Sequence, residues 1–263
     1  MKIGIPTLTT FKSIEEQVIF AHHLGLNLLE INLNYPYCLP SQNNPEKLKQ
    51  LSQKYNIQYT IHFDEYADFA SFHTSIKDAW VKQFKDTVDY ATSIGAYRMT
   101  IHLFEGIHVT MPHNIIYVNE VYYKEYFDRL YESLKEMNEY AFNHHIDLCI
   151  ENVSMPTFMQ KTFQKLIDLG FHFTYDVGHH YEFGECTHQI YEQHFSSVKH
   201  MHLHDVIECS PHKALGTGRI DLHNMMSLSK KYDMDIIIEV KDQKDIIQSV
   251  KYLKEKDLLN IIL

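Results

Sequence analysis

The chain has 263 residues, of which 44% are hydrophobic and 22% are charged, and its formal net charge is −10 at pH 7. This composition is ordinary for a globular protein with a sizeable core. No apolar run approaches the roughly 18–20 residues that a membrane span needs, so no membrane partner is expected. The acidic balance disfavours broad, non-specific contact with nucleic acid or anionic lipid.

The N-terminal sequence MKIGIPTLTT has too short an apolar stretch for a signal peptide and is typical of an opening strand. The four cysteines contain no C-x-x-C pair and are scattered along the chain, at Cys38, Cys149, Cys186 and Cys209. This pattern predicts reduced thiols and a cytoplasmic protein, without a disulfide framework or a thiolate zinc site.

Short apolar runs alternate with long amphipathic segments from one end of the chain to the other. The expected strands, in chain order, are Lys2–Pro6, Leu28–Asn32, Gln58–Phe63, Arg98–Leu103, Asp147–Glu151, His172–Asp176, Val198–Leu203 and Asp235–Val240. Between them apolar residues recur at steps of three or four, as at Trp80, Phe84 and Val88, which is typical of helices.

About eight β-then-α units without a linker or a change of composition predict an α/β fold, a single (β/α)₈ TIM barrel that spans residues 1–263 as one domain. A doubly wound open sheet is the alternative. It is disfavoured because no G-x-G-x-x-G motif follows the first expected strand.

The segment KHMHLHDV (199–206) has a histidine at every second position. Side chains alternate along a strand, so His200, His202 and His204 share one face. Most of the other expected strands also have one apolar face. On their opposite face, the last or nearly last residue is a histidine or a carboxylate. In chain order these residues are His62, His102, Glu151, Asp176, His202 and Glu239. Barrel active sites lie at the carboxyl ends of the strands, so we expect these side chains to meet there.

Three carboxylates gathered in a poorly solvated pocket repel one another unless a cation compensates them. A divalent metal supplies that charge, and histidines together with carboxylates are ligands that suit zinc or manganese. A single buried histidine or carboxylate is commonly just a hydrogen-bonded core residue. Six strands that end in such residues favour a metal site instead. His200 and His204, roughly 6.5 Å from His202 along the strand, are expected to lie around that site without binding the metal.

Seven segments in a fixed order resemble the xylose isomerase-like TIM barrel superfamily, which contains sugar phosphate isomerases/epimerases and the endonuclease IV-like proteins (AP endonuclease family 2). They are TIHF (60–63), TIHL (100–103), CIEN (149–152), TYDVGH (174–179), KHMHLHD (199–205), HKALGTGRID (212–221) and IIIEV (236–240). The resemblance implies one central metal ion held by Glu151, Asp176, His202 and Glu239.

Further metal positions follow from the endonuclease IV-like members. His62 and His102 match histidines that hold a second metal there, with Glu151 as the bridging ligand. His179 matches a residue that contacts substrate in epimerases and a third metal in endonuclease IV. His212 matches another histidine of that third metal.

The chain departs from endonuclease IV at one position. Two residues before the last histidine, where endonuclease IV has an aspartate, this sequence has Ser210. A serine hydroxyl is a poor substitute for a carboxylate on zinc, so this position disfavours a complete three-metal site. The nearby Asp205 is an alternative ligand, although its match lies outside the metal sphere.

The resemblance implies a metal-dependent sugar or sugar phosphate isomerase or epimerase, with a small sugar or polyol as partner. The metal, zinc or manganese, polarises a carbonyl while the adjacent carbon loses its proton. Glu151 and Glu239 would act from the two faces of the substrate, one removing the proton and the other returning it. His179 would hold a substrate hydroxyl or take up developing charge. A dehydratase or lyase would use the same first step.

The alternative function is an endonuclease IV-like zinc phosphodiesterase that cuts DNA at abasic sites, the one case in which nucleic acid is a partner. His62 and His102 favour it. The acidic balance and the small number of arginines (Arg98, Arg129 and Arg219) disfavour it, because a DNA enzyme engages several phosphates with Arg and Lys. A third interpretation is a metal-binding barrel without catalytic activity.

Three segments remain open in interpretation. The long segments 64–73 and 104–118 are rich in aromatic and apolar residues, which is typical either of lids over a site or of a surface buried in a homo-oligomer. The GTG segment at 216–218 is compatible with backbone amides that hold a phosphate or a hydroxyl group, and equally with an ordinary tight turn.

Overall fold

In the computed structural model, which describes residues 1–153, 155–182 and 186–262, eight parallel strands close into a barrel. They are β1 (Ile3–Pro6), β2 (Leu28–Asn32), β3 (Gln58–His62), β4 (Arg98–Ile101), β7 (Asp147–Glu151), β8 (His172–Asp176), β9 (Val198–Leu203) and β12 (Asp235–Ile238). Around the barrel the order is β1-β12-β9-β8-β7-β4-β3-β2. The predicted TIM barrel is confirmed.

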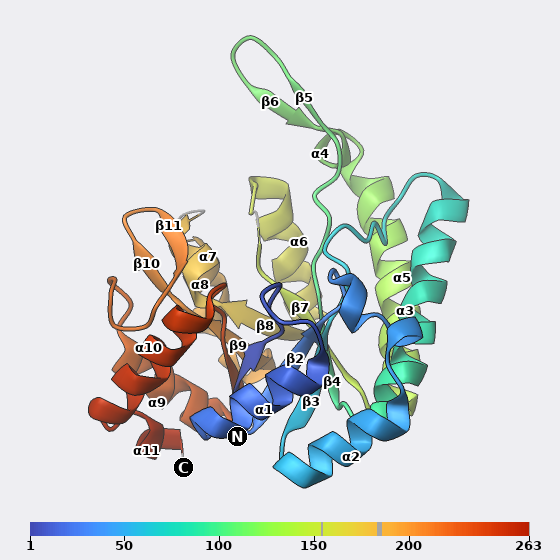
Figure 1. Cartoon of the computed structure of the whole chain (residues 1–263). Helices are drawn as coiled ribbons and strands as arrows, with labels where there is room; N and C mark the ends of the chain where they lie inside the picture. Colours follow the sequence, from blue (N-terminus) through green and yellow to red (C-terminus); the bar gives the residue numbers. More distant parts are fainter. Residues whose placement is uncertain (154, 183–185, 263) are drawn as a thin grey trace.

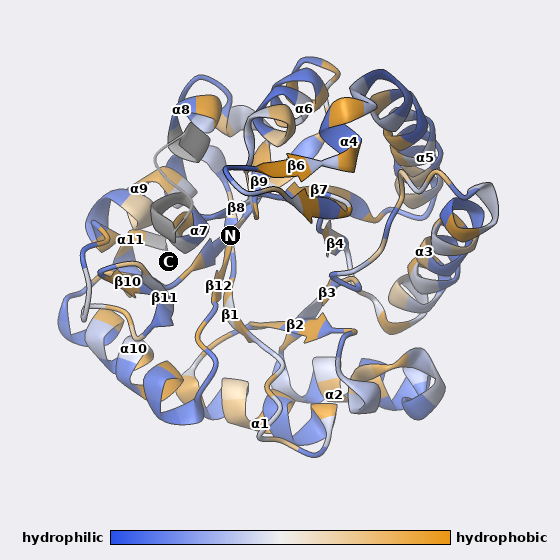
Figure 2. Ribbon diagram, turned by 90° about the horizontal axis from the view of Figure 1, so that it is seen from above, coloured by the Kyte–Doolittle hydropathy of each residue, from blue (hydrophilic) through white to orange (hydrophobic). Residues whose placement is uncertain are grey.

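Helices form a ring around the barrel (Figure 1, Figure 2). The long ones are α1 (Ile14–Leu24), α2 (Pro45–Tyr55), α3 (Thr74–Ile94), α5 (Tyr123–Asn143), α6 (Thr157–Asp168), α9 (Leu222–Tyr232) and α10 (Gln243–Glu255). The short ones are α4 (Val118–Val121), α7 (Val177–Glu182), α8 (Cys186–Glu192) and α11 (Leu259–Ile262), with 3₁₀ turns at Pro36–Cys38, Pro40–Gln42 and Phe195–Ser197. None of the helices in the described ranges is long and apolar enough to cross a membrane.

The strand bounds agree closely with the sequence pattern. Four barrel strands have the expected limits, and the other four are one or two residues shorter. Two antiparallel hairpins lie outside the expected strands, β5 (His108–Thr110) with β6 (Ile115–Tyr117) in the long segment 104–118, and β10 (Asp205–Ile207) with β11 (Ser210–Lys213). The β5–β6 hairpin extends away from the barrel (Figure 1). Cys38, Cys149 and Cys209 are free thiols, whereas the Cys186 side chain lies outside the described part.

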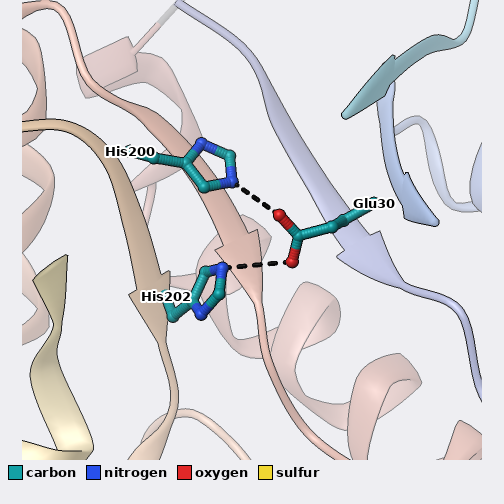
Figure 3. Close-up of side chains that lie close together, drawn as sticks. All are labelled: Glu30, His200 and His202. Carbon is teal, nitrogen blue, oxygen red and sulfur yellow. Dashed lines mark hydrogen bonds and ion pairs between the residues drawn. The ribbon is translucent and has the colours of Figure 1, made fainter. Parts of the chain in front are cut away.

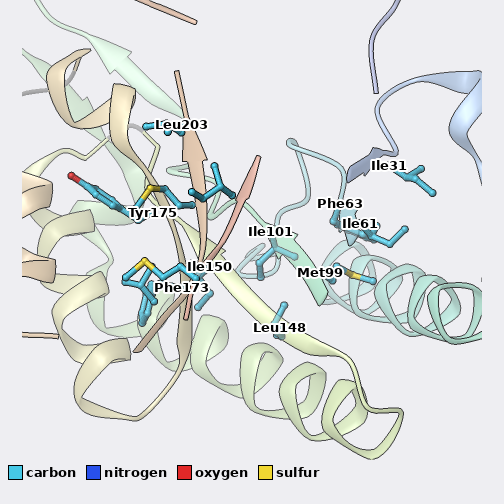
Figure 4. Close-up of a cluster of buried hydrophobic side chains, with 14 of the residues drawn as sticks. Ile31, Ile61, Phe63, Met99, Ile101, Leu148, Ile150, Phe173, Tyr175 and Leu203 are labelled. Carbon is cyan, nitrogen blue, oxygen red and sulfur yellow. The ribbon is translucent and has the colours of Figure 1, made fainter. Parts of the chain in front are cut away.

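The two faces of the barrel strands are of different character. Apolar side chains such as Ile61, Ile101 and Ile150 are buried in the layer between strands and helices (Figure 4). The opposite face of these strands carries buried polar side chains, and the hydroxyl oxygens of Thr100 and Thr174 lie 2.8 Å apart. TIM barrels ordinarily fill this interior with bulky branched apolar residues, so the polar interior indicates that the barrel supports a polar site.

Candidate metal centre

Four side chains from different strands meet at the carboxyl ends of the strands. Glu151 and Asp176 are the last residues of β7 and β8, and Glu239 follows β12 directly. His202 of β9 pairs in register with Asp176. All four are buried, and one possible ligand atom of each lies within 4.8 Å of those of the others. The structure thus brings together the four residues predicted for the central metal.

One nitrogen of His202 faces two of these carboxylates. Its Nδ1 atom is 3.2 Å from Oε1 of Glu151 and 3.2 Å from Oε2 of Glu239. Within the described residues, both Nδ1 of His202 and Oε2 of Glu239 are buried without a hydrogen-bond partner. Buried polar atoms in this condition are costly, and a divalent ion with nitrogen and oxygen ligands would satisfy both. The side chains present therefore fit a divalent metal.

Asp176 is held in place from several directions. The side chain of Asn152 donates to the Asp176 carbonyl at 2.9 Å and accepts its backbone N–H at 2.8 Å. Both carboxylate oxygens of Asp176 lie 3.2 Å from Nε2 of His204. Nδ1 of His204 accepts the backbone N–H of His212 at 2.8 Å, so the neutral ring carries its proton on Nε2, toward Asp176.

The second oxygen of Glu151 faces the two histidines predicted for a second metal. Its Oε2 atom lies 3.1 Å from Nε2 of His102 and 3.3 Å from Nε2 of His62. Burial by itself lowers the pKa of His62, but the charge and hydrogen bond of Glu151 outweigh it and raise this pKa to about 9. One carboxylate therefore separates the His62–His102 pair from His202, as a bridging ligand would.

The two histidines predicted for a third metal, His179 and His212, lie near each other. His179 has its Nδ1 atom 3.7 Å from Oδ2 of Asp176 and 3.8 Å from Oε1 of Glu151, and it bonds the Asn152 carbonyl at 3.0 Å. The ring of His212 lies 5.8 Å from that of His179, and burial lowers the pKa of His212 to about 4.

Asp205 does not take the place of the missing aspartate. Its Oδ1 accepts the backbone N–H groups of Val206 at 3.0 Å and Ile220 at 3.1 Å, and its Oδ2 accepts that of Gly216 at 2.9 Å. A Cβ at Gly218 would lie 2.3 Å from Oδ1 of Asp205. The GTG segment thus wraps an internal carboxylate as a tight turn, which corrects the expectation that Asp205 is an alternative metal ligand.

Two charged residues at the centre were not predicted. Lys241 places Nζ 2.6 Å from Oε1 of Glu239. Burial raises the pKa of Glu239, but Lys241 and His202 together hold it well below its ordinary value. Glu30, in the middle of β2, contacts His200 and His202. Burial raises its pKa as well, and the two histidines reverse that effect and lower it.

A cavity of about 520 Å³ opens onto the centre. Its lining residues are His62, Glu65, His102, Glu151, Val153, His179, Pro211, His212, Glu239 and Lys241. The volume is in the range of small-molecule sites, although the lining is more polar than most. The candidate metal ligands thus line a space that a small polar molecule can enter.

The closed barrel and the buried histidines and carboxylates at the ends of its strands define the class of this protein, an α/β barrel with a candidate metal site. Residues 18–256 match the profile of the Xylose isomerase-like TIM barrel family, and the chain belongs to that family. Among curated proteins, no sequence gives a significant match.

Solved structures with the same fold include several sugar epimerases. A D-tagatose 3-epimerase-like protein is 20% identical, with a TM-score of 0.81 over 100% of this chain and 98% of that one. D-psicose 3-epimerase with D-tagatose from Clostridium cellulolyticum H10 is 16% identical (TM-score 0.73, 100% and 96%). The 3-keto-D-glucoside 4-epimerase from E. coli is 14% identical (TM-score 0.76, 97% and 99%). At these identities the similarity shows the fold alone.

Proposed function

We propose that the protein is a divalent-metal-dependent sugar isomerase or epimerase. The observation that carries the proposal is the convergence of Glu151 and Glu239 on one atom, since each lies 3.2 Å from Nδ1 of His202. Their strands β7 and β12 are three steps apart around the barrel in one direction and five in the other. Two carboxylates that approach one point from nearly opposite walls suit the removal of a proton from one face of a substrate and its return to the other.

Each carboxylate is oriented by further side chains. Lys241 holds Oε1 of Glu239, and His62 with His102 hold Oε2 of Glu151. A bound divalent ion would polarise the carbonyl next to the carbon that loses its proton. His179, which lines the cavity while Nδ1 bonds the Asn152 carbonyl, would orient a substrate hydroxyl.

The cavity favours an unphosphorylated sugar over a sugar phosphate. Apart from histidines, Lys241 is the one cation among its described lining residues, and it is paired with Glu239. In the GTG segment, a candidate phosphate site, the Gly216 amide already donates to Asp205 and the Thr217 amide to the Ala214 carbonyl. The names of the similar structures include tagatose and psicose, which are free ketoses.

The test is to measure metal content per chain after gentle dialysis, followed by assays with a panel of ketoses and their phosphates. We expect at least one tightly bound ion and epimerisation or isomerisation of a free ketose that stops when a chelator removes the metal. A protein that binds no zinc or manganese, or that is metal-loaded but inert toward every sugar, would contradict the proposal.

A specific observation also supports a second candidate, abasic-site cleavage of DNA. His62 and His102 both approach Oε2 of Glu151, an arrangement that a single-metal epimerase does not need. Two or three zinc ions per chain together with cleavage of abasic DNA would favour this activity. Uncut abasic DNA with the fully loaded protein would dismiss it.

A further inference from the structure

Glu30 is an unusual residue for the interior of a barrel. It lies in β2, in the sequence LLEIN, whose five residues are all buried. The Glu30 side chain is 1% exposed. A carboxylate removed from water loses favourable hydration, so a buried one requires partners that compensate its charge.

The partners of Glu30 are His200 and His202, and His202 is one of the candidate metal ligands. Oε1 lies 3.1 Å from Nε2 of His200 and also accepts the Thr60 hydroxyl at 3.4 Å. Oε2 lies 3.1 Å from Nε2 of His202. Figure 3 shows that each oxygen faces its own ring. Each carboxylate oxygen thus has one imidazole nitrogen 3.1 Å away. The His200 contact is a hydrogen bond, whereas the His202 contact is an ion-pair distance without hydrogen-bond geometry.

His202 joins this buried group to the metal centre. Its Nε2 atom faces Glu30, while its Nδ1 atom faces Glu151 and Glu239. A neutral imidazole has a proton on one nitrogen and a lone pair on the other. When a divalent ion lies between Nδ1 and the two other glutamates, it takes the Nδ1 lone pair, and the carboxylate beside Nε2 favours the proton on that nitrogen. Histidines that bind metals commonly donate their second N–H to a carboxylate in this way.

We propose that Glu30 is a positioning residue that fixes the ring orientation and the Nε2–H tautomer of His202, so that Nδ1 is the atom offered to the metal. His200 supports it by holding the other carboxylate oxygen. This role rests on the proposed metal centre and adds to it a residue of the barrel interior that does not touch the metal or the substrate.

The first test compares metal affinity in Glu30→Gln and in wild type by competition with a chelator of known zinc affinity. Glu30→Gln keeps the side-chain volume but removes the charge that favours a proton on Nε2. We expect zinc to bind about 10–100-fold more weakly, the usual effect of losing such a partner. The matched control is Asp147→Asn, which removes a carboxylate that contacts the His172 ring at 2.6 Å, at the opposite end of β7 from Glu151. Its zinc affinity should equal that of wild type.

The second test reads the ring nitrogens directly and needs no activity. Nitrogen NMR of the zinc-loaded protein should show zinc on Nδ1 of His202 and a proton on Nε2 in wild type, and the Nε2–H signal should move in Glu30→Gln. Zinc on Nε2 of His202 in wild type, or equal zinc affinity in Glu30→Gln and wild type, would overturn the role of Glu30 alone. A wild-type protein that binds no metal would instead refute the proposed function, and the role of Glu30 with it. The wild-type spectrum decides even if the variant does not fold.

Discussion

The ring of His204 fills the space in which a side chain at Gly178 would lie. A Cβ atom at position 178 would be 1.7 Å from Cε1 of His204 and 2.4 Å from its Nδ1. The same ring faces both carboxylate oxygens of Asp176 from 3.2 Å. The glycine of the TYDVGH segment therefore has a packing role: it leaves room for His204, directly after β9, to lie against Asp176, a candidate metal ligand of β8.

Replacement of Gly178 by alanine tests this contact. Gly178→Ala should push the His204 ring away from Asp176, destabilise the protein by about 1–3 kcal/mol through overpacking, and weaken metal binding. The backbone is not the cause, because Gly178 lies in α7 and not in the left-handed region. Denaturant unfolding and metal titration measure the two effects.

The control for this prediction is the same substitution in a His204→Ala background. Once the ring is removed, Gly178→Ala should cost less than about 0.5 kcal/mol, because the two substitutions act on one contact. Additive costs in the double variant would show that the steric relationship is not what places His204.

Glu239→Gln tests the proposed two-glutamate mechanism. Loss of one of the two proton-transferring groups should lower kcat by about 10²–10⁴-fold, while thermal unfolding remains cooperative. Metal content must be measured alongside, since Glu239 is also a candidate ligand. Glu136→Gln, on the outer face of α5 where Glu136 pairs with Lys85, is the matched control and should behave as wild type. Wild-type turnover in Glu239→Gln would end the two-glutamate proposal.

His102→Ala tests whether a second metal position exists. Its Nε2 atom lies 3.1 Å from Oε2 of Glu151, on the side away from His202. If His62 and His102 hold a second ion, elemental analysis should show about one ion fewer per chain in the variant. His108→Ala, in the exposed β5 strand, serves as the histidine control and should not change the count. An unchanged count in His102→Ala would rule out the second position.

The sequence predicted those features that depend on periodicity and on chain order. The barrel strands follow from short apolar runs. The candidate ligands follow from the alternation of side chains between the two faces at the strand ends. Glu30 was missed although its strand was predicted correctly, because it lies in the middle of LLEIN, whereas the other candidate residues lie at strand ends. The signal was present, as a lone carboxylate in an apolar strand. The Lys241–Glu239 pair and the fit of His204 over Gly178 depend on side-chain packing that no linear pattern contains.

The final prediction concerns the amino ends of the strands, away from the metal centre. Nη1 of Arg98 lies 2.7 Å from Oδ2 of Asp235, and Nε of Arg98 lies 3.3 Å from Oδ2 of Asp147. Burial alone raises the pKa of both aspartates. At Asp147, His172 and Arg98 reverse this effect, and at Asp235 it is chiefly Arg98 that does so. Both pKa values therefore lie below the ordinary value for aspartate.

These two aspartates should make stability depend on acidity with a definite sign. Because their pKa values are lower in the folded protein, the unfolded chain takes up protons first as the pH falls. The stability that they contribute is therefore fully present above about pH 5, and it is lost as the pH falls through about 4 toward the folded pKa values. Asp235→Asn should cost about 3 kcal/mol at pH 7, since it leaves a buried arginine poorly paired, and the difference from wild type should shrink toward pH 3. Urea unfolding across this range measures it, with Asp86→Asn in the exposed Lys82 pair as control. A difference that stays constant from pH 7 to pH 3 would show that the Asp235 charge is not what stabilises this end of the barrel.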